Sequence, residues 1–314
     1  MSEQRKKSYV LLRSLALVSL VLQNAGVILA TKYSFRQDAK PYSQSAAILV
    51  SEILKLVTCL CVEFHVVDLD LQRLLRSLEF STSNVYMIFP STLYVLQNIA
   101  QLRAINGLTP ALYVTGVQLK VLTSAFFSAA ILRRQLSTRQ IISFFPLMAG
   151  VALVQLDQAG GPLTQFNFSA LSYLLVAVTL SGLAGVLLES AFKREGESIW
   201  VKNVYLSLFS LPSAMYATKV EAEEGGGHLN ASTISSGFDV FVFSVVILLA
   251  LGGLLTALVM KHAGTLTKCF AVSVSIVICS CVSVISGYQI VTPQVLLGAT
   301  LVIISVFLYA SNAQ

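Results

Sequence analysis

Two lysines stand in long apolar stretches of this chain, with no acidic residue within one helical turn. Lys120 lies deep in the stretch 111–132 and Lys268 near the start of the stretch 266–288. An ammonium group at bilayer depth costs at least about 2.5–3.5 kcal/mol on insertion scales, so each one requires an explanation. Snorkelling to the headgroups is an equal alternative for Lys268 and is harder for Lys120. A buried ammonium without a protein partner is best satisfied by an anionic ligand, so the two lysines predict a phosphate or diphosphate site.

A third lysine in an apolar stretch has an acidic neighbour. Glu52 and Lys55 are three residues apart, on one face of a predicted helix, so they can neutralise each other. A purely structural ion pair and a role in a binding site are both open for this pair.

Polar side chains form stripes on three other predicted helices. Tyr94, Gln97, Asn98 and Gln101 recur at helical spacing, and amides can read the edge of a base while a tyrosine ring stacks on it. A hydrogen-bond network between helices is the alternative. Asn203, Ser207 and Ser210 form a second polar stripe at helical spacing. Ser181, Gly182 and Gly185 are small residues that would let a ligand or a backbone come close.

The elements that carry these residues are membrane helices. Of 314 residues, 55% are hydrophobic and 11% charged, with a mean hydropathy of +0.77, whereas a soluble domain has about 25% charged residues. The net charge of +6 comes from basic residues that lie mostly between apolar segments, not in a stripe, so the expected partner is a lipid bilayer and not a nucleic acid.

Ten apolar windows are long enough to cross a bilayer. They predict an all-α polytopic membrane protein with the spans 8–31, 43–66, 84–105, 111–132, 139–157, 169–192, 198–217, 238–260, 266–288 and 293–311. The acidic, Gly-rich segment 218–237 is predicted to be an exposed loop. Eleven basic residues flank one side of these spans and five the other, so both termini are predicted to be cytosolic.

Ten spans divide into five and five, which would make the second half an inverted copy of the first. The predicted repeats are 1–157 and 158–314, within one membrane domain. The turns at 135–140 and 289–294 share the pattern Q-x-x-T-x-Q. A Thr N-cap at Thr138 and at Thr292 explains the shared threonine equally well. Lys120 and Lys268 begin similar small-residue runs 148 positions apart, whereas the two turns are 154 positions apart, so the runs and the turns are not in one register.

The residues singled out above also carry a family resemblance. The runs are Ser51-Glu52-Ile53-Leu54-Lys55-Leu56, Tyr94-Val95-Leu96-Gln97-Asn98, Gln118-Leu119-Lys120, Leu180-Ser181-Gly182-Leu183-Ala184-Gly185-Val186, Trp200-Val201-Lys202-Asn203, Gly252-Gly253-Leu254 and Lys268. They resemble the Golgi nucleotide-sugar transporters of the drug/metabolite transporter superfamily, in the branch that carries CMP-sialic acid and UDP-galactose.

The resemblance implies a ten-helix fold of two inverted five-helix repeats in the Golgi membrane. It also implies exchange of a cytosolic nucleotide-sugar for a luminal nucleoside monophosphate, CMP or UMP, without a cofactor or metal. By resemblance, Lys120 and Lys268 would contact phosphate, and Lys55 with Glu52 would lie towards the sugar. The nucleotide pocket would be lined by Tyr94, Gln97, Asn98, Tyr113, Ser181, Gly182, Asn203 and Ser207.

The sequence therefore predicts a pyrimidine nucleotide-sugar antiporter that works by alternating access, and a homodimer is one assembly to test. A carrier of another phosphorylated solute on the same fold is the main alternative. A membrane-embedded transferase is disfavoured because the three histidines lie at span edges or in the long loop, without clustered carboxylates. A receptor without transport is disfavoured by the polar groups at mid-depth.

Overall fold

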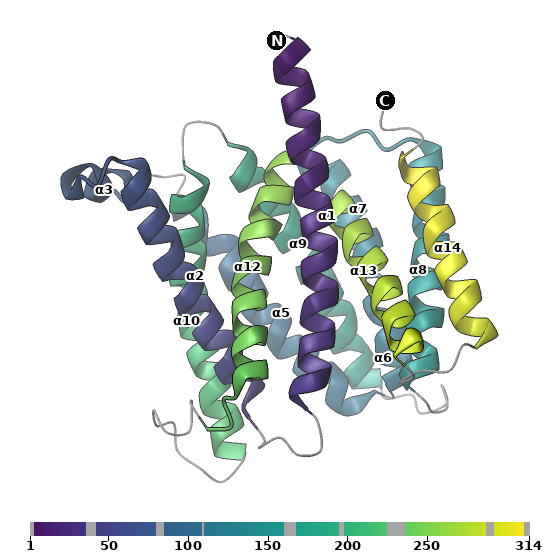
Figure 1. Ribbon diagram of the computed structural model, residues 1–314. Coiled ribbons are helices and arrows are strands. Elements are labelled where there is room, and N and C mark those ends of the chain that lie inside the picture. The colour runs from purple at the N-terminus through teal and green to yellow at the C-terminus, as the bar shows by residue number, and fades with distance from the viewer. Residues whose placement is uncertain are drawn as a thin grey trace. The chain divides into compact units, whose positions relative to one another are not determined.

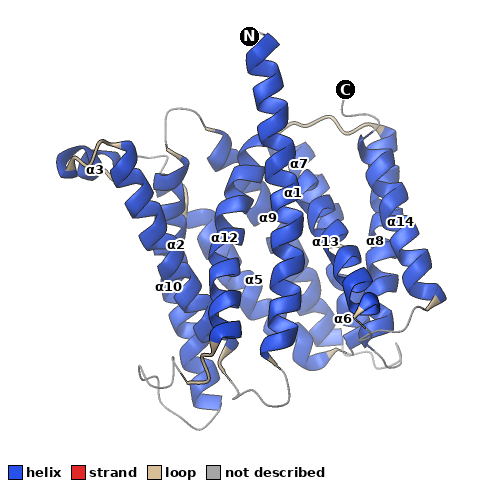
Figure 2. Ribbon diagram, in the orientation of Figure 1, coloured by secondary structure: helices blue, strands red, loops and turns tan. Residues whose placement is uncertain are grey.

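A computed structural model of the protein describes residues 3–35, 42–79, 85–108, 110–159, 168–194, 198–224, 236–286 and 292–310. Within these ranges every regular element is a helix (Figure 2). Figure 1 labels α1 (Glu3–Ser34), α2 (Gln44–Val66), α3 (Leu71–Ser77), α5 (Ile88–Gly107), α6 (Pro110–Val117), α7 (Lys120–Ile131), α8 (Thr138–Ala159), α9 (Phe168–Lys193), α10 (Ile199–Glu224), α12 (Val240–His262), α13 (Thr265–Ile285) and α14 (Pro293–Ala310).

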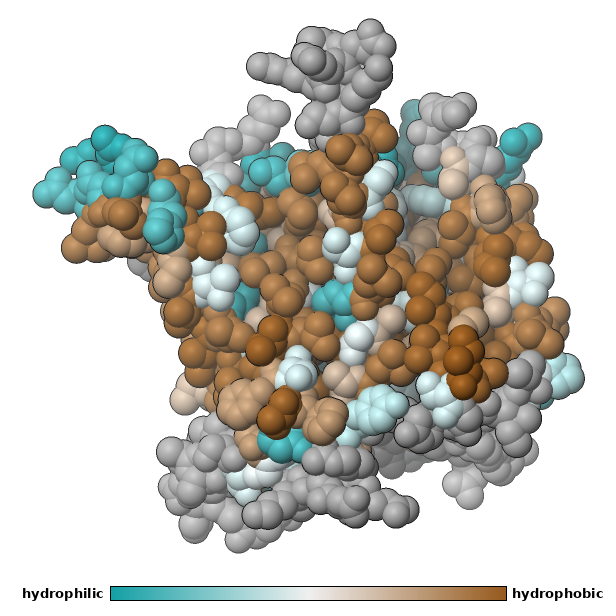
Figure 3. Space-filling model, in the orientation of Figure 1, coloured by the Kyte–Doolittle hydropathy of each residue, from teal (hydrophilic) through white to brown (hydrophobic). Residues whose placement is uncertain are grey.

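Seven of these helices are long and apolar enough to cross a membrane. They contain the segments Val10–Thr31, Gln44–Val66, Thr138–Leu156, Phe168–Lys193, Val240–His262, Thr265–Ile285 and Pro293–Ala310. Large hydrophobic side chains of α1, such as Val10, Leu11 and Leu22, are each 61% exposed, and hydrophobic side chains cover the visible face of α1 and α14 in Figure 3. An all-helical, multi-pass membrane protein is thus confirmed, while the total of ten spans stays a prediction.

Short polar residues start several helices. Ser43 accepts a hydrogen bond from the Ala46 N–H at the start of α2, and Thr292 accepts one from the Val295 N–H at the start of α14. At α8 the predicted cap at Thr138 is wrong. Ser137 caps this helix instead, because its Oγ accepts from the Gln140 N–H while the Gln140 side chain accepts from the Ser137 N–H, a reciprocal capping box.

The fourth predicted span, 111–132, is not one helix. α6 ends at Val117 and α7 begins at Lys120, with Gln118 and Leu119 in a turn. The N–H groups of Gln118 and Leu119 bond to carbonyls three residues back, as in a tight 3₁₀ turn. A Cβ atom at Gly116 would collide with the Leu174 side chain of α9, so this glycine makes room for a neighbouring helix just before the break.

The predicted loop 218–237 is wrong in its first part, because α10 continues to Glu224. The Glu221 carboxylate accepts hydrogen bonds from the backbone N–H groups of Gln44, at 3.2 Å, and Ser45, at 3.0 Å. A carboxylate is favoured at a helix N-terminus, where N–H groups lack partners inside the helix. Glu221 thus ties the polar end of α10 to the start of α2, and this contact explains the added helical turns.

Glu221→Gln is expected to destabilise the protein by about 1 kcal/mol at neutral pH. Burial alone would raise the pKa of this carboxyl, but hydrogen bonds from Ser45, Ser43 and Gln44 outweigh it and hold the pKa below its ordinary value. Its stabilising contribution is therefore full above the unfolded-state pKa and is lost as the pH falls through the lower folded-state pKa.

Thermal unfolding of detergent-solubilised protein across an acidic pH series would measure this effect. The difference between wild type and Glu221→Gln should shrink as the pH falls. Glu223→Gln is the matched control, because Glu223 is exposed and pairs with the exposed Lys219 at 3.7 Å. A Glu221→Gln deficit that does not change with pH would contradict the capping role.

The helices pack into two compact units, each built from both halves of the chain. Unit 1 comprises Met1–Thr92 and Ala191–His262, and in it α2 packs against α10 and α12, and α1 against α12. Tyr42, Ala47, Val242 and Val246 form a buried apolar cluster there.

Unit 2 comprises Leu93–Ser190 and Ala263–Gln314. Here α8 lies beside α14 (Figure 1), and α13 packs against α7, α8 and α14. Buried side chains from these helices form its main core: Val121, Phe144, Leu147, Val151, Leu266, Phe270, Val302 and Tyr309. A packing unit is not the same as a sequence repeat, so the predicted division at residue 157 stays a prediction.

Candidate functional site

Lys120 is the first residue of α7, directly after the break that follows α6. No side chain caps this helix start. A helix N-terminus presents backbone N–H groups and the positive end of the helix dipole, both of which favour an anion. The sequence placed Lys120 in the middle of a continuous span. In the structure a turn at Gln118 and Leu119 separates α6 from α7, and the N–H groups of Val121 and Thr123 in the first turn of α7 bond to the Gln118 and Leu119 carbonyls.

Lys268 lies one turn into α13, where its backbone N–H bonds to the Gly264 carbonyl at 3.1 Å. α13 packs against α7, and the charges of Lys268 and Lys120 are close enough to interact electrostatically. Within the described part of the chain, neither lysine forms an ion pair with a carboxylate. The structure therefore brings together the two cations that the sequence singled out.

Gly182 lets α9 approach the first turn of α7. A Cβ atom at this position would lie 2.7 Å from the Thr123 carbonyl carbon and 2.8 Å from the Ser124 nitrogen. The Thr123 hydroxyl donates to the Val178 carbonyl at 2.8 Å, which fixes the two helices at this level. Neighbouring Ser181 is partly buried. Gly182 thus positions the turn that carries Lys120.

Gly182→Ala is expected to lower ligand binding by about 10-fold or more, because overpacking that shifts backbone costs about 1–3 kcal/mol. The added methyl group has to push the Lys120 turn away from α9. Gly26→Ala is the matched control, since its Cβ would meet Leu248 at an ordinary 3.7 Å. Nucleotide titration of both purified variants measures the effect, and equal affinities would contradict this positioning role.

The polar stripe predicted on α5 has two kinds of residue: one bonds to a neighbouring helix, and another has a polar atom that a ligand can bind. Gln101 donates to the Tyr113 hydroxyl of α6 at 2.7 Å, so part of the stripe joins helices. The Gln97 Oε1 atom is buried without a hydrogen-bond partner among the described residues. Tyr94 is partly buried and Asn98 is exposed. Gln97 therefore offers an unused acceptor, whereas Tyr113 is already bonded.

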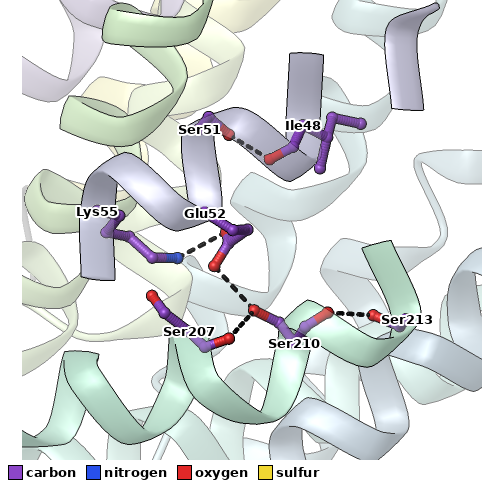
Figure 4. A network of polar contacts seen from close by, with 7 residues as sticks. All are labelled: Ile48, Ser51, Glu52, Lys55, Ser207, Ser210 and Ser213. Carbon is purple, nitrogen blue, oxygen red and sulfur yellow. Dashed lines mark hydrogen bonds and ion pairs between the residues drawn. The ribbon is translucent and has the colours of Figure 1, made fainter. Parts of the chain in front are cut away.

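The Glu52–Lys55 pair is formed and lies against α10 (Figure 4). The Lys55 Nζ donates to Glu52 Oε1 at 2.7 Å, and the side chain of Lys55 is only 7% exposed. The other oxygen of Glu52 accepts from the Ser210 hydroxyl at 2.8 Å. The aliphatic part of the Lys55 side chain packs against Gly253 of α12. A Cβ atom at Gly253 would lie only 2.8 Å from Lys55 Cδ, so the glycine makes room for the lysine.

Two polar atoms on α10, the helix whose Ser210 bonds to Glu52, have unused hydrogen-bonding capacity. Asn203 and Ser207 of α10 are 1% and 0% exposed. Asn203 Nδ2 donates to the Ile199 carbonyl, but its Oδ1 and the Ser207 Oγ have no partner among the described residues. A buried polar atom without a partner costs about 1–3 kcal/mol, so both atoms are candidates to bind a ligand.

The predicted site residues therefore fall into two sets, each held within one packing unit. Lys55, Asn203 and Ser207 belong to unit 1. The remaining predicted residues belong to unit 2: Tyr94, Gln97, Asn98, Tyr113, Lys120, Ser181, Gly182 and Lys268.

Sequence reasoning assigned no role to three buried charged residues. Lys202 is 1% exposed, and its Nζ donates to the carbonyls of Ala191 and Arg194, which closes the C-terminal end of α9. Glu63 accepts from the Ser198 hydroxyl, and Glu189 accepts from the Thr265 N–H at the start of α13. The only available signal was a charge in an apolar stretch, because the partners are distant in sequence.

Comparison with known proteins identifies the family of this chain. A family model described as "Nucleotide-sugar transporter" matches residues 8–310. The UDP-galactose translocator of Mus musculus is 35% identical over 95% of this chain and 78% of that protein. The UDP-galactose transporter of Schizosaccharomyces pombe is 35% identical over 95% and 87%, and the UDP-N-acetylglucosamine transporter of Rattus norvegicus is 33% identical over 96% of both.

A solved crystal structure with 12% sequence identity covers 96% of this chain and 97% of its own, with a TM-score of 0.68. This likeness concerns the fold alone. The match to the family model and the relatives above one third identity confirm the resemblance drawn from the polar runs. The chain belongs to the nucleotide-sugar transporter family, a family of transporters and not of enzymes.

Proposed function

We propose that this protein is an antiporter that exchanges a cytosolic UDP-sugar for luminal UMP across the Golgi membrane. The observation that carries the proposal is the pair Lys120 and Lys268, two interacting cations on packed membrane helices without a carboxylate partner in the described residues. Such a pair is costly when empty and is satisfied by a phosphate or diphosphate. UMP and a UDP-sugar both supply that charge.

The relatives favour UDP over CMP as the nucleotide. Those compared above are named for UDP-galactose or UDP-N-acetylglucosamine. The sequence alone left CMP-sialic acid and UDP-sugars open. A UDP-sugar with UMP as the return substrate is therefore the proposal, and CMP is the alternative to test.

The amide and hydroxyl groups supply the specificity in this proposal. Gln97, Asn203 and Ser207 each have an unused buried polar atom, and such atoms reject a ligand that leaves them unpaired. Tyr94, Asn98, Tyr113, Ser181 and Gly182 complete the proposed nucleotide pocket, and Lys55 contacts the sugar side.

Alternating access between two inverted five-helix repeats, 1–157 and 158–314, is part of the proposal. Helices at matching places in the two halves pack together, α2 with α10 and α8 with α14. In the second pair the contact is reciprocal, since a Cβ at Gly150 would lie 2.6 Å from the Gly298 carbonyl and one at Gly298 2.7 Å from the Gly150 carbonyl. These glycines are 148 positions apart, as are Lys120 and Lys268. The equal offset supports a repeat.

Orientation follows from the distribution of basic residues, which favours cytosolic N- and C-termini. The Golgi location is proposed by analogy with the family. A homodimer is a separate prediction, for light scattering of the purified protein to test.

Counterflow in proteoliposomes tests the exchange. Vesicles loaded with UMP, CMP, GMP, AMP or buffer would be given labelled UDP-galactose, UDP-N-acetylglucosamine or CMP-sialic acid outside. UMP-loaded vesicles should take up a UDP-sugar at least about 10-fold faster than buffer-loaded ones. Without a bound phosphate, the buried cation pair is uncompensated, and this raises the barrier for the carrier to reorient across the membrane.

Equal uptake into loaded and empty vesicles would contradict exchange. Uptake that occurs only into CMP-loaded vesicles would instead indicate that the substrate is CMP-sialic acid. Stabilisation by purine nucleotides or other phosphorylated solutes alone, in a thermal-shift panel of the same ligands, would favour a different solute on this fold.

A further inference from the structure

Glu189 is a fully buried carboxylate near the C-terminal end of α9. A carboxylate in an apolar span is retained only when hydrogen bonds and opposite charge compensate its lost hydration. Its Oε2 accepts a 2.6 Å hydrogen bond from the Thr265 N–H, and its Oε1 lies 4.0 Å from Arg134 Nη1. The Glu189 carboxylate is thus bonded to the first residue of α13.

α9 also holds Thr265 through the threonine side chain. The Thr265 hydroxyl donates to the Gly185 carbonyl at 2.9 Å, one turn before Glu189 on the same helix. A Cβ at Gly185 would lie 3.0 Å from Thr265 Cγ2, so a small residue is needed at this contact. Thr265 is thus fixed to α9 by its backbone through Glu189 and by its side chain through Gly185.

Gly264, the N-cap of α13, is shaped around the same carboxylate. Its φ of +92° lies in the left-handed region that favours glycine. A Cβ at this position would lie 2.5 Å from Glu189 Oε1. The carboxylate therefore occupies the space that a side chain at position 264 would fill, and it takes the place of an N-cap side chain, which Gly264 lacks.

This cap controls the turn that carries Lys268. The Lys268 N–H bonds to the Gly264 carbonyl, so the lysine is anchored to the residue that contacts Glu189. Lys268 and Lys120 repel one another, and an unrestrained first turn would let them separate. We propose that Glu189 is a positioning residue, which holds the first turn of α13 so that the Lys268 ammonium stays beside Lys120 to bind the substrate phosphate. This inference rests on the proposed function.

A double-mutant cycle tests whether Glu189 acts through Lys268. UMP affinity would be measured by calorimetry for full-length wild type, Glu189→Gln, Lys268→Ala and the double variant. Glu189→Gln should weaken UMP binding by at least about 10-fold, and should add almost nothing in the Lys268→Ala background. In the Lys120→Ala background the loss caused by Glu189→Gln should be smaller than in wild type, because no second lysine then repels Lys268.

Glu63→Gln is the matched control, because Glu63 is also a buried carboxylate in a membrane helix, bonded to the Ser198 hydroxyl in unit 1. It should lower thermal stability without changing the UMP affinity. Unchanged UMP affinity in Glu189→Gln, or losses that add fully with those of Lys268→Ala, would overturn the positioning role.

A second variant covers the case in which Glu189→Gln does not fold. Thr265→Val removes the hydroxyl bond to Gly185 at nearly constant shape and should weaken UMP binding about 3-fold, again only when Lys268 is present. Equal affinity with and without the hydroxyl would also overturn the inference. Wild-type protein that binds no UMP while it remains folded would instead show that the proposed function itself is wrong.

Discussion

Lys120→Ala should reduce UDP-sugar/UMP exchange to the level of empty vesicles while the protein still folds. A charge-assisted hydrogen bond contributes about 1.5–3 kcal/mol, which corresponds to roughly 10- to 150-fold in affinity. The loss should fall at the upper end, because Lys120 and Lys268 are the two interacting cations that the proposed site offers to the phosphate. Removal of one of two repelling cations should leave stability unchanged or raise it.

The measurement is UMP binding by calorimetry together with counterflow in liposomes. Lys120→Arg retains the charge but changes its shape, and should recover binding only in part. Lys219→Ala is the matched control, since Lys219 is exposed on α10 and pairs with Glu223 at 3.7 Å. A Lys120→Ala protein that binds UMP as wild type does would contradict a phosphate contact at this residue.

The sequence identified these lysines but not the geometry that makes them effective. An apolar stretch with one lysine is typical of one continuous helix, whereas the structure has a break before Lys120, and Leu174 of α9 packs at Gly116 beside this break. That contact joins residues on different helices, so no local pattern encodes it. The same holds for Glu189, whose partner Thr265 is 76 positions away.

Local signals identified two contacts whose partners are close in the chain, although the cap predicted at Thr138 lies at Ser137 instead. The Glu52–Lys55 pair and the cap at Thr292 follow from spacings of three residues, and both are present in the structure. The predicted loop 218–237 began too early, because charge and glycine content indicate a loop where α10 continues to Glu224. The Glu221 contact with the start of α2, which stabilises the added turns, is again distant in sequence.

The Glu52–Lys55 pair gives the largest expected effect on stability. Glu52→Ala would leave the Lys55 ammonium, whose side chain is 7% exposed, beside Gly253 without its carboxylate. Breaking a buried ion pair by removing one partner costs about 3–5 kcal/mol, mainly because the remaining charge is buried and uncompensated. Lys55→Ala should cost less, since the remaining Glu52 is more exposed, at 19%, and keeps its bond to Ser210.

The double variant Glu52→Ala/Lys55→Ala separates charge from packing. It removes both ions, so it should be more stable than Glu52→Ala alone although it loses more contacts. Thermal unfolding of the detergent-solubilised variants measures this order, with Asp68→Asn as the control. The Asp68–Arg73 pair is 82% and 60% exposed, and its loss should cost at most about 1 kcal/mol. A double variant as unstable as Glu52→Ala would mean that lost packing, and not an unpaired ammonium, causes the defect.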